Sequence, residues 1–107
     1  MKQYTLADLT VGGEGPVLRG ILPGHLAERG GITRYEYGTR SHPEGYHTHE
    51  FPEVFVIFQG SGFIEIDGAR TEFAAGDVFL VEAGEDHHVN SAGTVPLLSA
   101  WLHLHEA

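Results

Sequence analysis

The chain has 107 residues, enough for one modest hydrophobic core and too short for two. Six Lys and Arg against 15 Asp and Glu give a net charge of −9, which argues against nucleic acid and anionic membranes as partners. Cysteine is absent, so disulfides, thiolate metal sites and cysteine nucleophiles are excluded, and any metal must be held by nitrogen and oxygen atoms.

Short runs of β-branched and aromatic residues alternate with Gly, Pro, Asn and Asp, which is typical of an all-β protein. Helix signals are weak: Thr5–Asp8 has the form of a capping box, and His25–Arg29 fits a single helical turn. Strands are predicted at Val17–Leu22, Ile32–Tyr37, Val54–Gln59, Phe63–Asp67, Thr71–Phe73, Val78–Glu82, His87–Asn90 and Val95–His105.

Two turn signals lie in the middle of the chain. Gly60–Gly62 separates two strand runs, and Asp67-Gly68 is a preferred sequence for a type I′ turn. We expect two consecutive antiparallel hairpins there. The 15 glycines, about twice ordinary usage, supply the positive φ angles and bulges that bend sheets. The predicted fold class is therefore an all-β sandwich or barrel.

Two of the predicted strands are apolar on both faces, because every residue of Val54–Phe58 and of Val78–Val81 is apolar. A strand with one face in water alternates apolar and polar residues. The outside of this sheet is therefore expected to pack on a second layer or on another subunit, and we predict a homodimer. Neither run is long enough to cross a bilayer, and no signal peptide is evident, so we expect a soluble, cytoplasmic protein without a membrane partner.

The segment Tyr46–Glu53 carries the strongest functional signal. In a strand, residues two apart point to one side with Cα atoms about 6.6 Å apart. His47 and His49 can therefore direct two imidazoles at one ion. Glu53 lies at an even offset from both, and its carboxylate can reach the same centre past a bulge expected at Pro52. A fourth ligand must come from elsewhere, and His87, at the start of a later strand, is the natural candidate.

These residues resemble the two motifs of the cupin family. The first motif ends H-x-H, three or four residues, E, six residues, G, and its positions are held here by His47, His49, Glu53 and Gly60. The second is G, five residues, P-x-G, two residues, H, three residues, N, and is met at Gly76, Gly84 and His87. Glu82 and Ser91 replace its proline and asparagine, and Ser41 replaces the glycine that opens the first motif.

The resemblance implies a single cupin domain over residues 1–107, with its motif-bearing core at about 32–91. Its fold would be a double-stranded β-helix, or jelly-roll barrel, with little helix and a metal pocket at its open end. It implies that His47, His49, Glu53 and His87 hold one divalent transition metal, whose identity among Fe, Mn, Ni, Zn and Cu the ligand types leave open. An octahedral ion would keep two positions for water, oxygen or a chelating ligand.

Four residues are weaker candidates for substrate contact. Tyr35, Phe55 and His103 can belong to the pocket wall, and Arg40 can anchor an acidic ligand.

The remaining histidines are expected to be structural. In Trp101–His105 we favour a structural role for His103 and His105, with Leu102 and Leu104 facing the core. If the other face lines the barrel interior, His103 contacts the ligands or the substrate. His88 is expected to point outward or into an interface, and His25 and His42 to lie in loops.

Two classes of function fit this pattern. We favour a metal-dependent enzyme acting on a small molecule, either an oxidoreductase of dioxygenase type or a Lewis-acid isomerase or decarboxylase. The alternative is a non-catalytic module that binds a metal or a small ligand. A histidine-rich metal store fits poorly, because the histidines are spread over strands. Neither a Ser/His/Asp triad nor a phosphate-binding glycine loop is visible, which argues against acyl and phosphoryl transfer.

Overall fold

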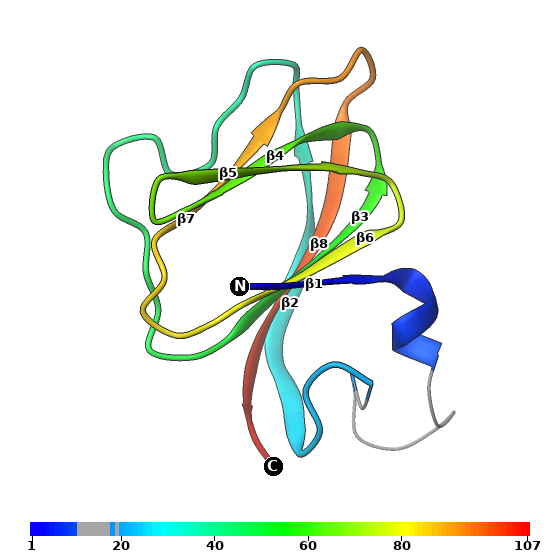
Figure 1. The fold of residues 1–107 in the computed structure, drawn as a ribbon, viewed down its shortest axis with the longest axis vertical. Helices are drawn as coiled ribbons and strands as arrows, with labels where there is room; N and C mark the ends of the chain where they lie inside the picture. The colour runs from blue at the N-terminus through cyan, green and yellow to red at the C-terminus, as the bar shows by residue number, and fades with distance from the viewer. Residues whose placement is uncertain (11–17, 19) are drawn as a thin grey trace.

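The computed structural model describes residues 1–10, 18 and 20–107 (Figure 1). Its elements are β1 (Lys2–Thr5), the 3₁₀ helix η1 (Leu6–Thr10), β2 (His25–Tyr35), β3 (Glu53–Gln59), β4 (Ser61–Ile66), β5 (Ala69–Ala74), β6 (Asp77–Val81), β7 (His87–Ser91) and β8 (Leu97–Glu106). They form two antiparallel sheets, one of order β1-β6-β3-β8-β2 and one of order β5-β4-β7. The all-β prediction is confirmed. Among the described residues, no helix is long and apolar enough to cross a membrane.

The two predicted hairpins have different outcomes. β4 and β5 form a hairpin with Ile66 opposite Ala69, and Asp67 and Gly68 have φ angles of 48° and 85°, as a type I′ turn requires. The hairpin across Gly60 is wrong, because β3 and β4 belong to different sheets. Gly60 has a φ of 89°, and a Cβ there would lie 3.0 Å from the Leu97 backbone. Glycine therefore lets the chain pass from one sheet to the other at this point.

The N-terminal third departs most from the sequence-based expectation. The Thr5–Asp8 signal does mark a helix, η1, in which the Asp8 carboxylate accepts a hydrogen bond from the Thr5 backbone N–H at 2.8 Å. His25–Arg29 is not a helical turn but the start of β2, which long-range pairing with β8 holds extended. The predicted strand Val17–Leu22 is wrong at 18 and 20–22, which form turns and a bend, and its positions 17 and 19 lie outside the described residues.

The predicted strand Ile32–Tyr37 covers only the end of β2, which begins at His25 and ends at Tyr35. The six later strand predictions agree with β3 to β8 to within about two residues at each end. β1, in contrast, has no counterpart among the predictions. It is short, only one of its residues is partly buried, and it pairs with β6 at the edge of the larger sheet.

Two apolar clusters cover the two faces of the larger sheet. The cluster between the sheets consists of Phe55, Ile57, Ile64, Phe73, Phe79, Val81, Val89 and Leu97. The cluster on the outer face consists of Leu18, Ile21, Val54, Val56, Val78, Leu80 and Leu104, with Tyr4, Leu9 and Leu22 packed against it. In Figure 1, η1 and the turn at residues 20–24, which we call the N-terminal cover, lie away from β4 and β5. The second layer that the apolar strands required is thus supplied by the same chain, and the homodimer stays a prediction.

Candidate metal centre

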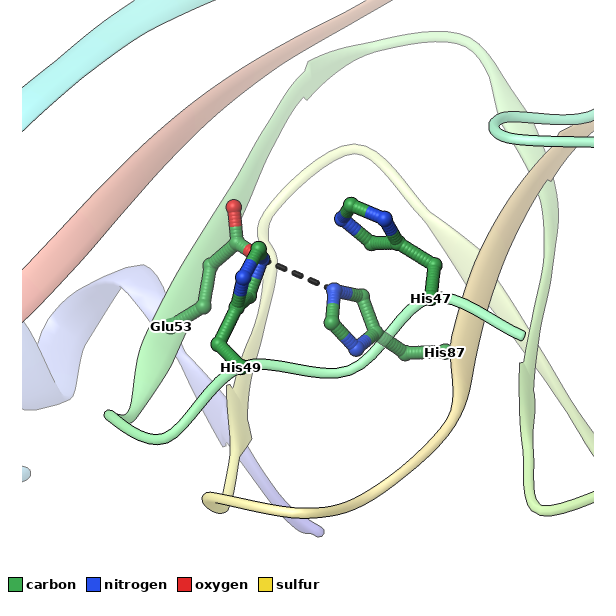
Figure 2. A group of neighbouring side chains, drawn as sticks. All are labelled: His47, His49, Glu53 and His87. Atoms are coloured by element: carbon green, nitrogen blue, oxygen red, sulfur yellow. Dashed lines mark hydrogen bonds and ion pairs between the residues drawn. The ribbon is translucent and has the colours of Figure 1, made fainter.

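The candidate site forms where two segments distant in sequence meet (Figure 2). His47 and His49 lie in the connection between β2 and β3, while Glu53 and His87 are the first residues of β3 and β7. The His47 carbonyl accepts a hydrogen bond from the His87 N–H at 3.2 Å, and the His49 carbonyl accepts one from the Gly84 N–H at 2.8 Å. These bonds tie the two segments together beside the ligands.

Two local predictions are wrong here. His47 and His49 do not lie in a strand, because residues 46–49 carry no strand assignment. Pro52 marks no bulge and directly precedes β3. The hydrogen bonds to residues 84 and 87 replace a sheet ladder and still bring both imidazoles to one side.

The four side chains converge on one space, as Figure 2 shows, and we call them the cage. Their candidate ligand atoms all lie within 4.8 Å of one another. Glu53 Oε1 is 3.1 Å from His49 Nε2 and 2.9 Å from His87 Nε2. Donors about 2.1 Å from an octahedral ion are about 3.0 Å apart when cis and about 4.2 Å apart when trans. A small contraction of the cage therefore suffices to hold one ion.

The hydrogen bonds of His87 prepare its Nε2 atom for a cation. Nδ1 lies 3.0 Å from the backbone carbonyl oxygen of Glu85, which can only accept, so neutral His87 carries its proton on Nδ1. Nε2 then directs a lone pair at Glu53 Oε1, which is also an acceptor. Two facing acceptors are satisfied only when a proton or a metal ion lies between them. The residues present therefore fit a metal ion.

The pKa values of the metal-free cage follow from the same contacts. Burial lowers the pKa of His87, but its hydrogen bonds to Glu53 and Glu85 outweigh burial and raise it overall. Burial raises the pKa of Glu53, but the hydrogen bond and charge of His87 leave it below the ordinary value. Burial, together with the charge of His42, lowers the pKa of His47 to about 4, and burial lowers that of His49. Both are thus neutral at pH 7, as metal ligands must be.

A cavity of about 370 Å³ opens onto the cage. Besides three cage residues, His47, His49 and Glu53, its lining consists of Thr33, Tyr35, Ser41, His42, Trp101 and His103. No Lys or Arg lines this cavity in the part of the chain that the structure describes. A space of this size, with an aromatic wall and a few polar groups, suits a small organic ligand.

The four residues predicted to contact substrate divide into two groups. Tyr35 and His103 line the cavity. Phe55 is buried in the core beside His87, with ring centroids 5.9 Å apart, and is not part of the lining. Arg40 lies outside the cavity, where its Nε atom donates to Glu65 Oε1 at 2.8 Å. It borders a second hollow, which we define by Arg40, Gly45, Tyr46, Asp67, Gly68, Asp86 and His88.

Two histidine predictions are wrong. His88 is buried, with only 2% of its surface exposed, and therefore does not point outward. Its Nδ1 is 2.9 Å from the Ser41 carbonyl oxygen, and its Nε2 is 3.0 Å from Asp86 Oδ1. His25 begins β2 and does not lie in a loop.

The side chains of β8 alternate between the two faces of the sheet, as predicted for Trp101–His105. Leu104 is buried and Leu102 packs against the same outer cluster. The opposite face of β8 lines the cavity through Trp101 and His103, while His105 is more exposed and pairs with Glu28.

Four cavity residues were missed in the sequence. Trp101 lies two residues from His103, and Thr33 lies two residues from Tyr35, so each shares a strand face with a predicted candidate. This spacing could have identified both as cavity residues. His42 stands in a loop, as expected, and its ring stacks on His47 with centroids 3.4 Å apart. His42 and Ser41 lie outside the strands, so no periodic pattern in the sequence indicates that they line the cavity.

The model of the Cupin domain matches residues 31–104. Among solved structures, a Cupin 2 conserved barrel domain protein from Salinispora arenicola is 27% identical, with a TM-score of 0.61 over 69% of this chain and 60% of that chain. A predicted oxalate decarboxylase from Thermotoga maritima is 26% identical, with a TM-score of 0.64 over 72% and 65%. This chain thus spans less than two thirds of either protein.

A mutant of the salicylate 1,2-dioxygenase from Pseudoaminobacter salicylatoxidans is 20% identical, with a TM-score of 0.58 over 78% of this chain and 27% of that chain. At this identity the likeness concerns the fold alone.

Proposed function

The chain belongs to the cupin domain family, and we propose that it is a metal-dependent enzyme acting on a small organic molecule. The observation that carries the proposal is the convergence of His47, His49, Glu53 and His87 beside an open cavity of about 370 Å³. A structural metal site is closed by protein ligands, whereas a reactive site keeps positions for external ligands. Four ligands on an octahedral ion leave two such positions.

The residues of this site have different proposed roles. A bound divalent ion of Fe, Mn, Ni, Zn or Cu supplies Lewis acidity or redox chemistry. The three imidazoles and the carboxylate would hold such an ion with a net charge of +1, because only Glu53 carries a compensating charge. Tyr35 and Trp101 form the wall against which a small ligand packs.

The charge of the cavity favours a ligand that is anchored at the ion. Arg40 faces Glu65 outside the cavity, so its predicted role as an acid anchor gains no support from its position. Within the described lining the metal site is the remaining point of positive charge once loaded. A ligand with one or two oxygen donors that can fill the open positions is therefore favoured.

The reaction type is proposed as either oxygenation or Lewis-acid isomerisation or decarboxylation. One structural neighbour is a salicylate 1,2-dioxygenase and another is a predicted oxalate decarboxylase, so both chemistries have been assigned to barrels of this kind.

We further propose that residues 1–107 form a single domain. We propose that this domain assembles as a homodimer and that its partner is a small-molecule substrate.

The first experiment measures bound metal in the purified protein and in His47→Ala and His87→Ala variants, with His25→Ala as the matched control. His25 is a histidine outside the cage, at the start of β2. We expect one metal ion per chain in the wild type and in the control and none in the other two. Equal metal content in all four proteins would overturn the proposed site.

The second experiment separates an enzyme from a binding module. Iron, manganese and nickel forms are incubated with small enols, flavonols, keto acids and sugars, while oxygen uptake and substrate loss are followed. Turnover that disappears in His87→Ala supports the enzyme. Saturable binding without turnover in every metal form would instead favour the non-catalytic module.

A further inference from the structure

A fourth imidazole reaches the cage from a strand that supplies none of its four residues. His103 of β8 is the register partner of Glu53 of β3. Side chains of directly opposed residues in an antiparallel pair lie on the same face. Accordingly, His103 Nε2 lies 3.1 Å from Glu53 Oε2, with only 12% and 6% of the two side chains exposed.

The two oxygens of Glu53 have different surroundings. Oε1 faces the Nε2 atoms of His49 and His87 and belongs to the cage. Oε2 faces His103. Because a carboxylate oxygen only accepts, the contact is a hydrogen bond when His103 carries a proton on Nε2.

The neighbours of His103 hold its ring in this position. The ring centroids of Phe51, Trp101 and His49 lie 4.7, 4.9 and 4.7 Å from that of His103. A ring packed on several sides loses little further freedom when it makes a hydrogen bond, so the bond to Oε2 is preorganised.

We propose that His103 is a positioning residue that makes Glu53 a ligand through one oxygen only. Its Nε2–H holds Oε2, which leaves Oε1 to bind the ion. Carboxylates bind metals through one or both oxygens, and a ligand that uses one oxygen leaves another coordination position free on the cavity side. This inference rests on the proposed metal site and adds to it the residue that keeps the site open.

The test uses Co²⁺ as the probe, with its affinity measured by calorimetry and its ligand geometry by visible absorption. His103→Phe keeps an aromatic ring against Phe51 and Trp101 but removes the donor. His103→Gln places an amide N–H near the position of the imidazole Nε2. The matched control is His105→Phe, because His105 lies on the same face of β8 and pairs with Glu28 instead of the cage.

We expect His103→Phe to weaken Co²⁺ binding by about 10- to 100-fold and to shift the absorption bands. His103→Gln should regain most of the affinity and the wild-type bands, and His105→Phe should match the wild type. Should His103→Phe fail to fold, His103→Asn, whose amide is too short to reach Oε2, replaces it with the same expected loss.

Wild-type affinity and bands in the donor-free variant would overturn the role of His103 while leaving the metal site intact. A wild-type protein that binds no Co²⁺ would overturn the proposed metal site and, with it, this inference. Loss of affinity in His103→Gln equal to that in His103→Phe would also count against it, because restoring an N–H donor would then not restore binding.

Discussion

The cage and the second hollow both take residues from the connection between β2 and β3 and from the start of β7, yet they gather different numbers of potential metal ligands. His87 and His88 are neighbours on β7, with His87 in the cage and His88 in the hollow. Both ring nitrogens of His88 lie within 3.0 Å of oxygen acceptors, and Arg40 in the hollow pairs with Glu65. In the cage, the three imidazoles face a single carboxylate.

This difference supports the cage as the candidate cation site. His87 and His88 each direct one ring nitrogen at a backbone carbonyl and the other at a carboxylate oxygen, so this pairing alone does not distinguish the two sites. The cage differs because three imidazoles converge on the carboxylate of Glu53, whereas the hollow has one imidazole and already holds the positive charge of Arg40. The presence of His, Asp and Glu does not by itself indicate a metal site. Several ligand atoms that converge beside an open cavity do.

The largest expected contrast comes from replacing the two neighbouring histidines by leucine. His87→Leu removes a cage ligand, so we expect its affinity for a divalent metal to fall by about 100-fold or more. His88→Leu should keep one metal ion per chain but lower the free energy of unfolding by about 1–3 kcal/mol, because the Ser41 carbonyl and Asp86 lose a buried partner. Metal titration and urea unfolding measure the two effects separately.

The reverse pattern would break the comparison. If His88→Leu lost the metal while His87→Leu kept it, the hollow and not the cage would be the ion site.

A second contrast concerns the gain in melting temperature on adding metal. The pKa of His87 is raised by its bonds to Glu53 and Glu85 although burial opposes this, so its proton stabilises the metal-free fold below pH 6.5. That stabilisation is lost as pH rises through the raised pKa, where a metal ion can take the proton's place. Metal at 100 times its Kd stabilises by about 2.7 kcal/mol.

We therefore expect the rise in Tm on adding metal to be larger at pH 8 than at pH 6, since protons compete for the ligands at the lower pH. Differential scanning calorimetry with and without metal checks this. His87→Leu serves as the control and should show little gain at either pH. A gain that grows as the pH falls would contradict the ligand assignment.

The convergence of the four cage residues could be predicted from the sequence, in part because three of them are close together in the chain. His47, His49 and Glu53 lie within one short segment, and the motif spacing supplied His87. The type I′ turn at Asp67-Gly68 was predictable for the same reason, since the conformation follows from the two turn residues themselves.

The burial of His88 and the sheet change after β3 could not be predicted, because both depend on long-range packing. Nothing next to His88 in the sequence shows that the Ser41 carbonyl oxygen contacts its Nδ1 atom. Gly60 marks a bend in the sequence, but the sequence does not show that Gly60 comes close to the Leu97 backbone or that β4 leaves the sheet of β3. A local pattern can indicate that a chain turns without indicating which strand it meets next.

A third contrast separates the outer apolar face from the cage. Ile21 is buried against the outer cluster and does not contribute to the cavity lining. We expect Ile21→Ala to lower the free energy of unfolding by about 2 kcal/mol or more, because it leaves a cavity under the N-terminal cover. Metal affinity should remain at the wild-type value. Urea unfolding and metal titration provide the check, and a parallel loss of metal binding would mean that the cover and the cage are coupled.

The smallest expected effect concerns the Arg40–Glu65 ion pair beside the hollow. The hydrogen bonds from Arg40 and Asn90 lower the pKa of Glu65, so the pair stabilises the fold above pH 4.5 and loses this contribution as pH falls through the lowered pKa. Because both side chains are partly exposed, we expect Arg40→Gln to cost no more than about 1 kcal/mol at pH 7. The cost should shrink toward zero in acid, and Co²⁺ affinity should stay unchanged. Urea unfolding at pH 7 and pH 3.5 measures the first two outcomes. A weaker Co²⁺ affinity in Arg40→Gln would instead join the hollow to the cage and remove the distinction between them.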